Sequence, residues 1–487
     1  MEGMESFVGE NLDREAEKLR ETFRSGKTKC VNWRRSQLKA ILTLLREKEE
    51  EIFMALYKDL GKHRCEAYRD EIGVLEKTLK VALASLDEWV TTKKAKLPLA
   101  AFPTIGEIKP EPLGLVLIFS SWNFPFGLAL QPLIGAIAAG NTVILKPSEL
   151  APACSSVLAD IIPMYLDYEA VKVVKGGAMI AQRLLEMKWD KIFFTGSPRV
   201  GSIVMSAAAK HLTPVTLELG GKCPAVIDSL ASSWDRKIAT KRIIAGKYGA
   251  CGGQACIGID YILVLEEFAP VLIELLKIWI KRIYAENPRE SMTRILNKSC
   301  FLRLKKILSD PAVGNSIIHG GSLDEDNLYI EPTILLNPPL EAEIMTDEIF
   351  GPILPIITLT KIEDSIEFIN SRPKPLALYV FTNNETLKTR MINETSSGSL
   401  TFNDAVIQYT FETIPFGGVG QSGFGRYHGK FSFDTFSHEK GILKRSFLTE
   451  FWFRFPPWTA NKLQLLRLAY DLDYFGIVLN VLGLKRS

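Results

Sequence analysis

The sequence has almost no excess of charge of either sign. Its 487 residues include 59 Lys and Arg against 56 Asp and Glu, a formal net charge of +3. A nucleic-acid-binding protein would carry a clustered basic excess, so this balance argues against such a partner. Apolar residues make up 47% and charged residues 24%, as in ordinary globular proteins. A chain of this length outgrows a single hydrophobic core, and two or more domains are expected.

Cysteine and histidine are also scarce, with seven and five residues. An odd number of scattered cysteines is unlike a disulfide framework and predicts free thiols in a reducing compartment. The sequence has no zinc-type Cys-x-x-Cys pair and no histidine cluster, so no metal site is predicted. The first residues, Met1–Glu5, are acidic and do not resemble a signal peptide, so the cytosol is the expected location.

Long hydrophobic runs are missing as well. The final segment, Leu448–Ser487, is rich in Phe, Trp and Leu, and its longest uncharged run is Tyr474–Leu484. That run is too short to span a bilayer, which needs roughly 20 apolar residues. We expect this tail to dock on the protein body or on a dimer partner, with membrane attachment as the less favoured alternative.

Three charged stretches near the N-terminus have apolar residues at helical spacing, namely 9–25, 33–60 and Ala67–Trp89. We expect amphipathic helices there, with their charge runs forming solvated faces. From Ile108 onward, short apolar runs alternate with helical spans, which is typical of a doubly wound α/β domain. The predicted strands are Leu113–Phe119, Thr142–Lys146, Val171–Val174 and Lys191–Phe194, and the predicted helices are Leu128–Ala139 and Pro152–Ile162.

Polar residues follow two of these strands, at the sheet edge where parallel α/β sheets bind ligands. They are Lys146, Ser148 and Glu149 after one strand, and Gly196, Ser197 and Val200 after the other. The lysine and carboxylate suit the hydroxyls of a ribose, and the start of a helix after the glycine suits a pyrophosphate. Taken alone, each motif is more often an ordinary turn or helix cap.

The glycine-rich stretch Lys247–Cys256 places a thiol between a predicted helix, Lys241–Ala250, and a predicted buried strand, Ile257–Val264. A sharp turn there would expose Cys256 as a nucleophile, although a lone cysteine is more often a small buried hydrophobe. Upstream, Glu218 stands in an otherwise apolar segment before a glycine pair. Burial would raise the pKa of this carboxyl, so the two residues are the parts of a covalent thiol mechanism.

Three ordered motifs, Glu218–Lys222, Gly253–Cys256 and Glu348–Pro352, resemble signatures of the NAD(P)-dependent aldehyde dehydrogenases. The resemblance runs from the first helices to about Lys440 and is strongest to the class 3, plant-type members. Three further motifs carry the class 3 likeness, namely Trp122–Pro125, Pro415–Gly420 and Tyr427–Lys430.

The resemblance implies an α/β fold with a Rossmann-type cofactor domain, an α/β catalytic domain and a small β bridging arm. Residues 1–220 would bind NAD(P), with 105–112 contributing to the arm, and residues 221–405 would form the catalytic domain. Residues 406–440 would be the bridging, oligomerisation segment and 441–487 a C-terminal tail. A homodimer is expected, because the family's arm adds a strand to its partner's sheet.

The resemblance also implies a mechanism. Cys256 would attack the aldehyde carbonyl, and the oxyanion would be held by the Asn123 side-chain amide and the Cys256 backbone N–H. Hydride would pass to the nicotinamide, and Glu218 would activate the water that hydrolyses the thioester to a carboxylic acid. Glu348, followed by Phe350, would hold the nicotinamide-side ribose.

NAD is the expected cofactor, because Glu149 beside the adenosine ribose would repel a 2′-phosphate. NADP remains an alternative, since Lys146 offers a compensating charge and Val200 is a modest side chain. An apolar surround with Phe416 and Phe402 predicts medium-chain aliphatic or aromatic aldehydes of the kind formed by lipid peroxidation. Gly418–Gly423 matches Gly-x-Gly-x-x-Gly, but its context is wrong for a dinucleotide loop.

The sequence departs from the family pattern at two residues. Cys251 stands where an asparagine is usual, which predicts a second thiol near the first and a reversible inactivating disulfide. Gln408 stands where class 3 relatives often carry histidine, which leaves the substrate preference open. Activation of Cys256 is also unexplained, because a preceding helix C-terminus would disfavour a thiolate. Two alternatives stay open: a catalytically silent binding protein and a cofactor-free thiol esterase.

Overall fold

The computed structural model describes residues 2–284, 288–448 and 450–484, and the chain divides into two compact units. The larger unit contains residues 1–86 and 112–436, and the smaller contains residues 87–111 and 437–487. Two sheets with their helices make up most of the larger unit. Both the predicted cofactor residues and the predicted catalytic residues therefore belong to one compact body.

Helices fill the N-terminal part of the chain, as predicted. They are α1 (Glu2–Arg24), α2 (Val31–Glu47), α3 (Glu49–Leu60), α4 (Arg64–Ala67), the π-helical turn η2 (Tyr68–Ile72) and α5 (Gly73–Val90). The single helix expected over 33–60 is wrong, because the backbone leaves helical geometry at Lys48 (φ −108°, ψ 14°). Glu49, Glu50 and Glu51 follow, and acidic residues stabilise the positive end of a new helix.

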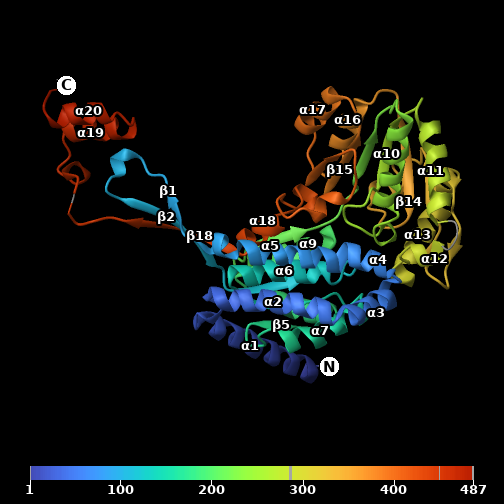
Figure 1. Cartoon of the computed structure of the whole chain (residues 1–487), viewed down its shortest axis with the longest axis horizontal. Helices are drawn as coiled ribbons and strands as arrows, with labels where there is room; N and C mark the ends of the chain where they lie inside the picture. Colours follow the sequence, from blue (N-terminus) through green and yellow to red (C-terminus); the bar gives the residue numbers. More distant parts are fainter. Residues whose placement is uncertain (1, 285–287, 449, 485–487) are drawn as a thin grey trace. The chain divides into compact units, whose positions relative to one another are not determined.

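The first sheet has the order β17-β7-β6-β3-β4-β5 and is parallel except for β17. Its strands are β3 (Leu115–Phe119), β4 (Thr142–Lys146), β5 (Val171–Val173), β6 (Lys191–Thr195), β7 (Val215–Glu218) and β17 (Gly423–Phe424). The helices between them are α6 (Gly127–Ala139), α7 (Pro152–Tyr165), α8 (Ala178–Glu186) and α9 (Pro198–Ala209). Helices α1 and α6 pack on β3 and β4, and α2 packs on α6 and α7 (Figure 1). The predicted doubly wound α/β domain is confirmed.

The second sheet has the order β10-β13-β14-β9-β8-β15-β16 and is parallel except for the edge strand β10. Its strands are β8 (Pro224–Ile227), β9 (Tyr261–Leu265), β10 (Ile317–His319), β13 (Thr333–Leu336), β14 (Ile353–Leu359), β15 (Ala377–Phe381) and β16 (Ser399–Phe402). Helices α10 (Ser233–Lys247) and α11 (Ala269–Tyr284) pack side by side along it (Figure 1). The other helices of this region are α12 (Pro288–Ser291), α13 (Lys298–Ser309), α14 (Pro311–Gly314), α15 (Glu343–Thr346), α16 (Asp364–Asn370) and α17 (Glu385–Glu394). The chain passes from the first sheet to the second between Glu218 and Pro224.

The turn expected around Cys256 is longer than predicted. Helix α10 ends at Lys247 and β9 begins only at Tyr261, with the 3₁₀ turn η4 (Cys251–Gly253) between them. The apolar residues after Cys256 are buried but not in a strand, because their backbone bonds run elsewhere. Ile259 N–H donates to Gly246 O (3.0 Å) and Asp260 N–H donates to Cys223 O (2.8 Å).

The smaller unit contains the sheet β1-β2-β18, formed by β1 (Lys93–Ala95), β2 (Ile105–Pro112) and β18 (Ser437–Lys444). Lys444 pairs with Glu107 (2.7 Å). Of the bridging segment expected over 406–440, only the part from Ser437 onward lies in this sheet. Residues 406–436, with helix α18 (Gly429–Thr435), belong to the larger unit.

The tail adds the short helices α19 (Ala460–Tyr470) and α20 (Tyr474–Val481) to the smaller unit. The Tyr474 hydroxyl accepts a hydrogen bond from Leu99 N–H (3.2 Å). Across the described ranges, no helix combines the length and the apolar content needed to cross a bilayer. Docking of the tail on a partner stays a prediction.

Candidate active site

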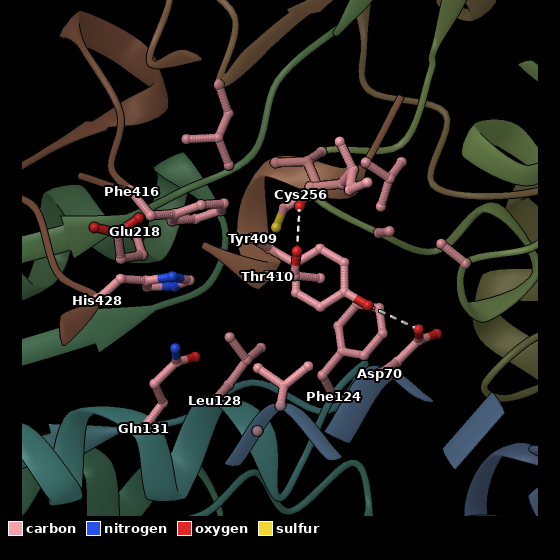
Figure 2. Close-up of a pocket in the computed structure, with 18 of the residues that line it drawn as sticks. Asp70, Phe124, Leu128, Gln131, Glu218, Cys256, Tyr409, Thr410, Phe416 and His428 are labelled. Carbon is pink, nitrogen blue, oxygen red and sulfur yellow. Dashed lines mark hydrogen bonds between the residues drawn. The ribbon is translucent and has the colours of Figure 1, made fainter. Parts of the chain in front are cut away.

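A cavity of about 330 Å³ in the larger unit brings the predicted thiol and the predicted base together. Glu218, at the end of β7, and Cys256, in the loop after α10, both line it (Figure 2). Its other lining residues include Asp70, Phe124, Leu128, Gln131, Tyr409, Phe416 and His428. The volume suits a small organic molecule, and most of the lining surface is apolar.

The backbone around Cys256 is held from several sides. Tyr379 donates its hydroxyl proton to Ile257 O (2.6 Å), and the Cys223 thiol donates to Cys256 O (3.4 Å). The Asn123 side-chain amide donates to Gln254 O (3.0 Å), two residues before the thiol. These bonds fix the loop although it belongs to no regular element, so the position of the Cys256 sulfur is set by tertiary contacts.

The Cys256 side chain is partly exposed, but its surroundings disfavour the thiolate. Burial, together with the nearby carboxyls of Glu348 and Glu218, raises the pKa of Cys256 to about 12. The helix C-terminus expected to disfavour the thiolate is not the cause, because α10 ends nine residues earlier, at Lys247. The electrostatic resistance to ionisation comes from the cavity itself.

Glu218 is buried with no polar partner. Its exposed fraction is 3%, and neither carboxyl oxygen has a hydrogen-bond partner. Burial raises the pKa of Glu218 well above its ordinary value, as predicted from the sequence. A carboxyl without a partner, facing the same cavity as a thiol, is suited to exchanging a proton with a water or ligand there.

The cofactor residues predicted after β4 lie close together, and Lys146 and Glu149 bond to each other. Lys146, at the end of β4, donates to Glu149 (2.8 Å) and to Pro147 O (3.3 Å). Burial works to raise the pKa of Glu149, but the bond from Lys146 brings it below its ordinary value. Ser148 accepts from Leu150 N–H (3.3 Å) and closes the turn.

At the second strand end, β6 runs into a glycine and then into α9. Gly196 N–H donates to Glu218 O (3.0 Å), which joins this turn to the strand that carries the predicted base. Ser197 caps α9, its hydroxyl accepting from Val200 N–H (3.4 Å). The buried hydroxyls of Ser120 and Thr195, which follow β3 and end β6, have no hydrogen-bond partner. Unpartnered hydroxyls at the carboxyl ends of two parallel strands lie at the sheet edge where α/β domains bind ligands, and they fit a bound dinucleotide.

Glu348 lies in the loop between α15 and β14, beside the second sheet. Burial raises the pKa of Glu348 to about 8, although the Gly221 backbone N–H lowers it. Phe350 adopts a positive φ of 52° and packs edge-to-face on Trp122, with ring centroids 5.4 Å apart. Trp122 adjoins Asn123, so Phe350 lies close to the loop expected to hold the oxyanion.

Comparison with known proteins agrees with this geometry. The aldehyde dehydrogenase family model matches residues 5–442. The chain belongs to the aldehyde dehydrogenase family. A family 3 member F1 aldehyde dehydrogenase of Arabidopsis thaliana is 56% identical over the whole of both chains. An aldehyde dehydrogenase of Craterostigma plantagineum is 48% identical, with 96% of this chain and 97% of the relative covered.

A solved structure supports the same assignment. The substrate-bound Staphylococcus aureus AldH is 42% identical, with a TM-score of 0.91 over 94% of this chain and 99% of that chain. The predicted family and fold are confirmed, and the enzyme oxidises aldehydes to carboxylic acids as family 3 members do. The family uses NAD(P).

Several residues of the aldehyde dehydrogenase cavity were not foreseen. Asp70 lies in a charge run expected to be solvated, yet it is 7% exposed and accepts from Tyr409 OH (2.9 Å; Figure 2). Gln131 and His428 each leave a buried nitrogen without a partner. Gln131 alone interrupts the apolar sequence of α6 and could have been found on that ground. Asp70 and Tyr409 carry no such signal.

Two expectations about the cavity wall have different outcomes. Phe416 lines the cavity and stacks on His428, with ring centroids 5.0 Å apart. Phe402 does not, and instead packs against the core of the second sheet. Gln408 turns away too, donating to the Tyr379 hydroxyl (2.9 Å), so it supports the Cys256 loop.

The Gly418–Gly423 segment leads into β17, which is antiparallel, as expected for a segment that is not a dinucleotide loop.

The second thiol, Cys251, is buried and donates to Asn123 O (3.3 Å). Both Cys251 and Cys256 are free thiols, and a disulfide between them stays a prediction. Within the described residues, no group of three or more His, Cys, Asp or Glu side chains is arranged to hold a metal ion.

Proposed function

We propose that Cys256 is the nucleophile of this aldehyde dehydrogenase and Glu218 its general base. The observation that carries the proposal is that the two side chains line one cavity, where Glu218 has no other partner. The thiolate of Cys256 adds to the carbonyl carbon of the aldehyde and gives a tetrahedral oxyanion. The Asn123 amide and the Cys256 backbone N–H stabilise that oxyanion.

Glu218 acts after the hydride has left the substrate carbon. Bound NAD(P) supplies the hydride acceptor. Glu218, once ionised, takes a proton from the water that attacks the thioester carbonyl, which releases the carboxylic acid and the Cys256 thiolate. Its unpartnered oxygens support this role, because no hydrogen bond must break before water is engaged.

For the cofactor, we propose that Lys146 and Glu149 hold the adenosine ribose, with Ser148 shaping their turn. Gly196, Ser197 and Val200 would face the pyrophosphate at the start of α9. Glu348 would bond the nicotinamide-side ribose, with Phe350 beside it. NAD is the proposed cofactor, because Glu149 carries a charge that a 2′-phosphate would meet.

The mechanism is tested with an aliphatic aldehyde such as hexanal and NAD, following the absorbance of the reduced nicotinamide. Cys256→Ala should abolish the signal. Glu218→Gln should give a burst close to one equivalent and then a rate about 100-fold below the parental one, because hydrolysis of the thioester loses its base. Glu412→Gln is the matched control, since Glu412 is buried but bonded to Thr78 outside the cavity.

Unchanged steady-state turnover in Glu218→Gln would reject the assignment. The same assay separates the other readings of the sequence. A silent family member would produce no reduced nicotinamide, and a cofactor-free esterase would cleave an ester but not oxidise hexanal.

The apolar lining supports medium-chain aliphatic or aromatic aldehydes, including products of lipid peroxidation, as the substrates. We also propose a cytosolic homodimer joined through the sheet of β1, β2 and β18, which size-exclusion chromatography with light scattering would test. The scattered free thiols suit a reducing compartment, although a 47% identical Arabidopsis relative is named as chloroplastic.

A further inference from the structure

A buried ion pair lies beside the cavity and has no part in the chemistry proposed above. Lys62 is 1% exposed, and its ammonium donates to Glu71 (2.7 Å) and to the backbone carbonyl of Asn123 (2.8 Å). The ammonium also stands 4.2 Å from the centre of the Phe124 ring. Two of the three groups around this charge, Asn123 O and the Phe124 ring, thus belong to the segment that carries the proposed oxyanion donor.

Glu71 continues the same connection. It is fully buried in the π-helical turn η2, and its second oxygen accepts from Phe126 N–H (2.8 Å) and Gly127 N–H (3.1 Å). These groups are at the start of α6, three and four residues after Asn123. The pair therefore holds the segment 123–127 at both of its ends. Burial alone would lower the pKa of Lys62, but Glu71 raises it overall, so the ammonium keeps its charge.

The thiol loop is held against the same carbonyl. Cys251 donates its thiol proton to Asn123 O (3.3 Å), and its backbone N–H donates to Glu66 (2.8 Å). Asn123 O thus accepts from both Lys62 and Cys251, while the Asn123 amide reaches Gln254 O on the Cys256 loop. Burying two charges is costly unless close pairing and further hydrogen bonds satisfy both of them, and here the bonds to Asn123 O, Phe126 N–H and Gly127 N–H do so.

We propose that Lys62, held by Glu71, is a positioning residue that fixes Asn123 for stabilising the oxyanion on the Cys256 adduct. The proposal rests on the role of Asn123 proposed above. An oxyanion donor works only if it is in place before the charge develops, and a shift of about 1 Å costs about 100-fold in rate. Removal of the ammonium leaves Asn123 O with the weak thiol donor alone.

The test uses the full-length enzyme with Lys62 and Glu71 replaced together, K62M/E71Q, so that no lone charge stays buried. Three rates are measured: hexanal oxidation with NAD, cofactor-free hydrolysis of p-nitrophenyl acetate, and alkylation of Cys256 by iodoacetamide. The first two pass through an oxyanion, and the third does not. We expect the first two rates to fall at least about tenfold, with alkylation and the KM for NAD within about twofold of parental values.

Two comparison variants make the result specific. K62Q/E71Q keeps a neutral donor near Asn123 O and should recover part of the lost rate. It takes the place of K62M/E71Q in the three measurements if K62M/E71Q fails to fold. K172M removes another buried lysine, which pairs with Glu15 at the edge of the first sheet, and should leave all three rates unchanged.

The variant Asn123→Ala distinguishes a failure of the positioning role of Lys62 from a failure of the oxyanion role of Asn123. If Asn123→Ala slows ester hydrolysis while K62M/E71Q does not, the positioning role of Lys62 is wrong and the oxyanion role of Asn123 stands. If Asn123→Ala itself hydrolyses the ester at the parental rate, the oxyanion role fails and this proposal fails with it. A parallel loss of alkylation and hydrolysis in K62M/E71Q would show a general loosening of the thiol loop and would also overturn the proposal.

Discussion

The carboxyl group of Glu348 lies directly against Gly220, so that a Cβ added to Gly220 would stand 2.7 Å from Glu348 Cδ. Gly220 follows β7 at the passage between the two sheets, and Glu348 comes from the side of the second sheet. Only a residue without a side chain lets the two approach this closely. The relationship fixes where the Glu348 carboxyl stands relative to the first sheet, whose carboxyl edge we propose for the cofactor.

Gly220→Ala should therefore raise the KM for NAD by about tenfold, because the new methyl displaces the Glu348 carboxyl group that we propose bonds the ribose. The KM for hexanal should change much less. Gly177→Ala is the control, since a Cβ at Gly177 would meet no atom within 4 Å. Initial rates at varied NAD would decide, and an unchanged KM would remove Glu348 from the ribose site.

The reactivity of Cys256 should rise with pH over an unusually wide range. Its pKa is raised to about 12 by burial and by the carboxyls of Glu348 and Glu218. Because the thiolate is the reactive form, its alkylation rate in the cofactor-free enzyme should rise about tenfold per pH unit through pH 10. Mass spectrometry of the Cys256 peptide after timed iodoacetamide treatment would measure it. A plateau near pH 8 would mean that the thiol is activated in solution.

Glu218→Gln should make the protein more stable at high pH. The folded pKa of Glu218 is raised by burial, so its favourable contribution is complete below the ordinary pKa and is lost as pH rises through the folded value. That loss is about 1.4 kcal/mol per pH unit between the two pKa values. Thermal melts at pH 6 and pH 9 should show the variant gaining on the parent, and an equal difference at both values would contradict the burial argument.

Regular elements with both faces buried were predictable from the sequence. Strand β4 has the predicted bounds, because all five of its residues are buried and a proline follows. Elements that depend on tertiary bonds were not predictable. The π-helical turn η2 was not foreseen, since its buried Asp70 and Glu71 read as a solvated charge run until Tyr409 and Lys62 are seen to bond them.

The candidate site divides in the same way. The position of Glu218 in an apolar strand before a glycine pair announces a buried carboxyl, and the structure gives it no partner. The strand predicted over Ile257–Val264 begins only at Tyr261, because hydrophobicity records burial but not the direction of backbone bonds. The role of Gln408 was hidden for a related reason, since its contact with Tyr379 joins segments far apart in the sequence.

Glu149→Gln should raise kcat/KM with NADP and should change kcat/KM with NAD by no more than a few fold from the parental value. The bond from Lys146 keeps Glu149 ionised at neutral pH, so its charge would repel a 2′-phosphate at the proposed ribose site. In the variant, Lys146 loses this ionic partner and keeps its bond to Pro147 O. A gain of about tenfold with NADP is expected from one removed repulsion. Glu274→Gln, on the exposed face of α11, is the control. No gain with NADP would refute the repulsion argument.

Gln131→Leu should both stabilise the enzyme and shift its substrate preference. The Gln131 side chain is 6% exposed and its amide nitrogen has no partner, whereas the rest of the α6 face in the cavity is apolar (Figure 2). Removing a buried unsatisfied group should add about 1 kcal/mol to the free energy of unfolding. A fully apolar wall should raise kcat/KM for hexanal relative to an aldehyde of equal length bearing a hydroxyl. Leu128→Ala, on the same wall, should have the opposite effect on hexanal. A loss of stability in Gln131→Leu would contradict this prediction, because it would mean that the Gln131 amide nitrogen has a partner within the cavity. The variant would then lose that contact, and its preference between the two aldehydes should disappear.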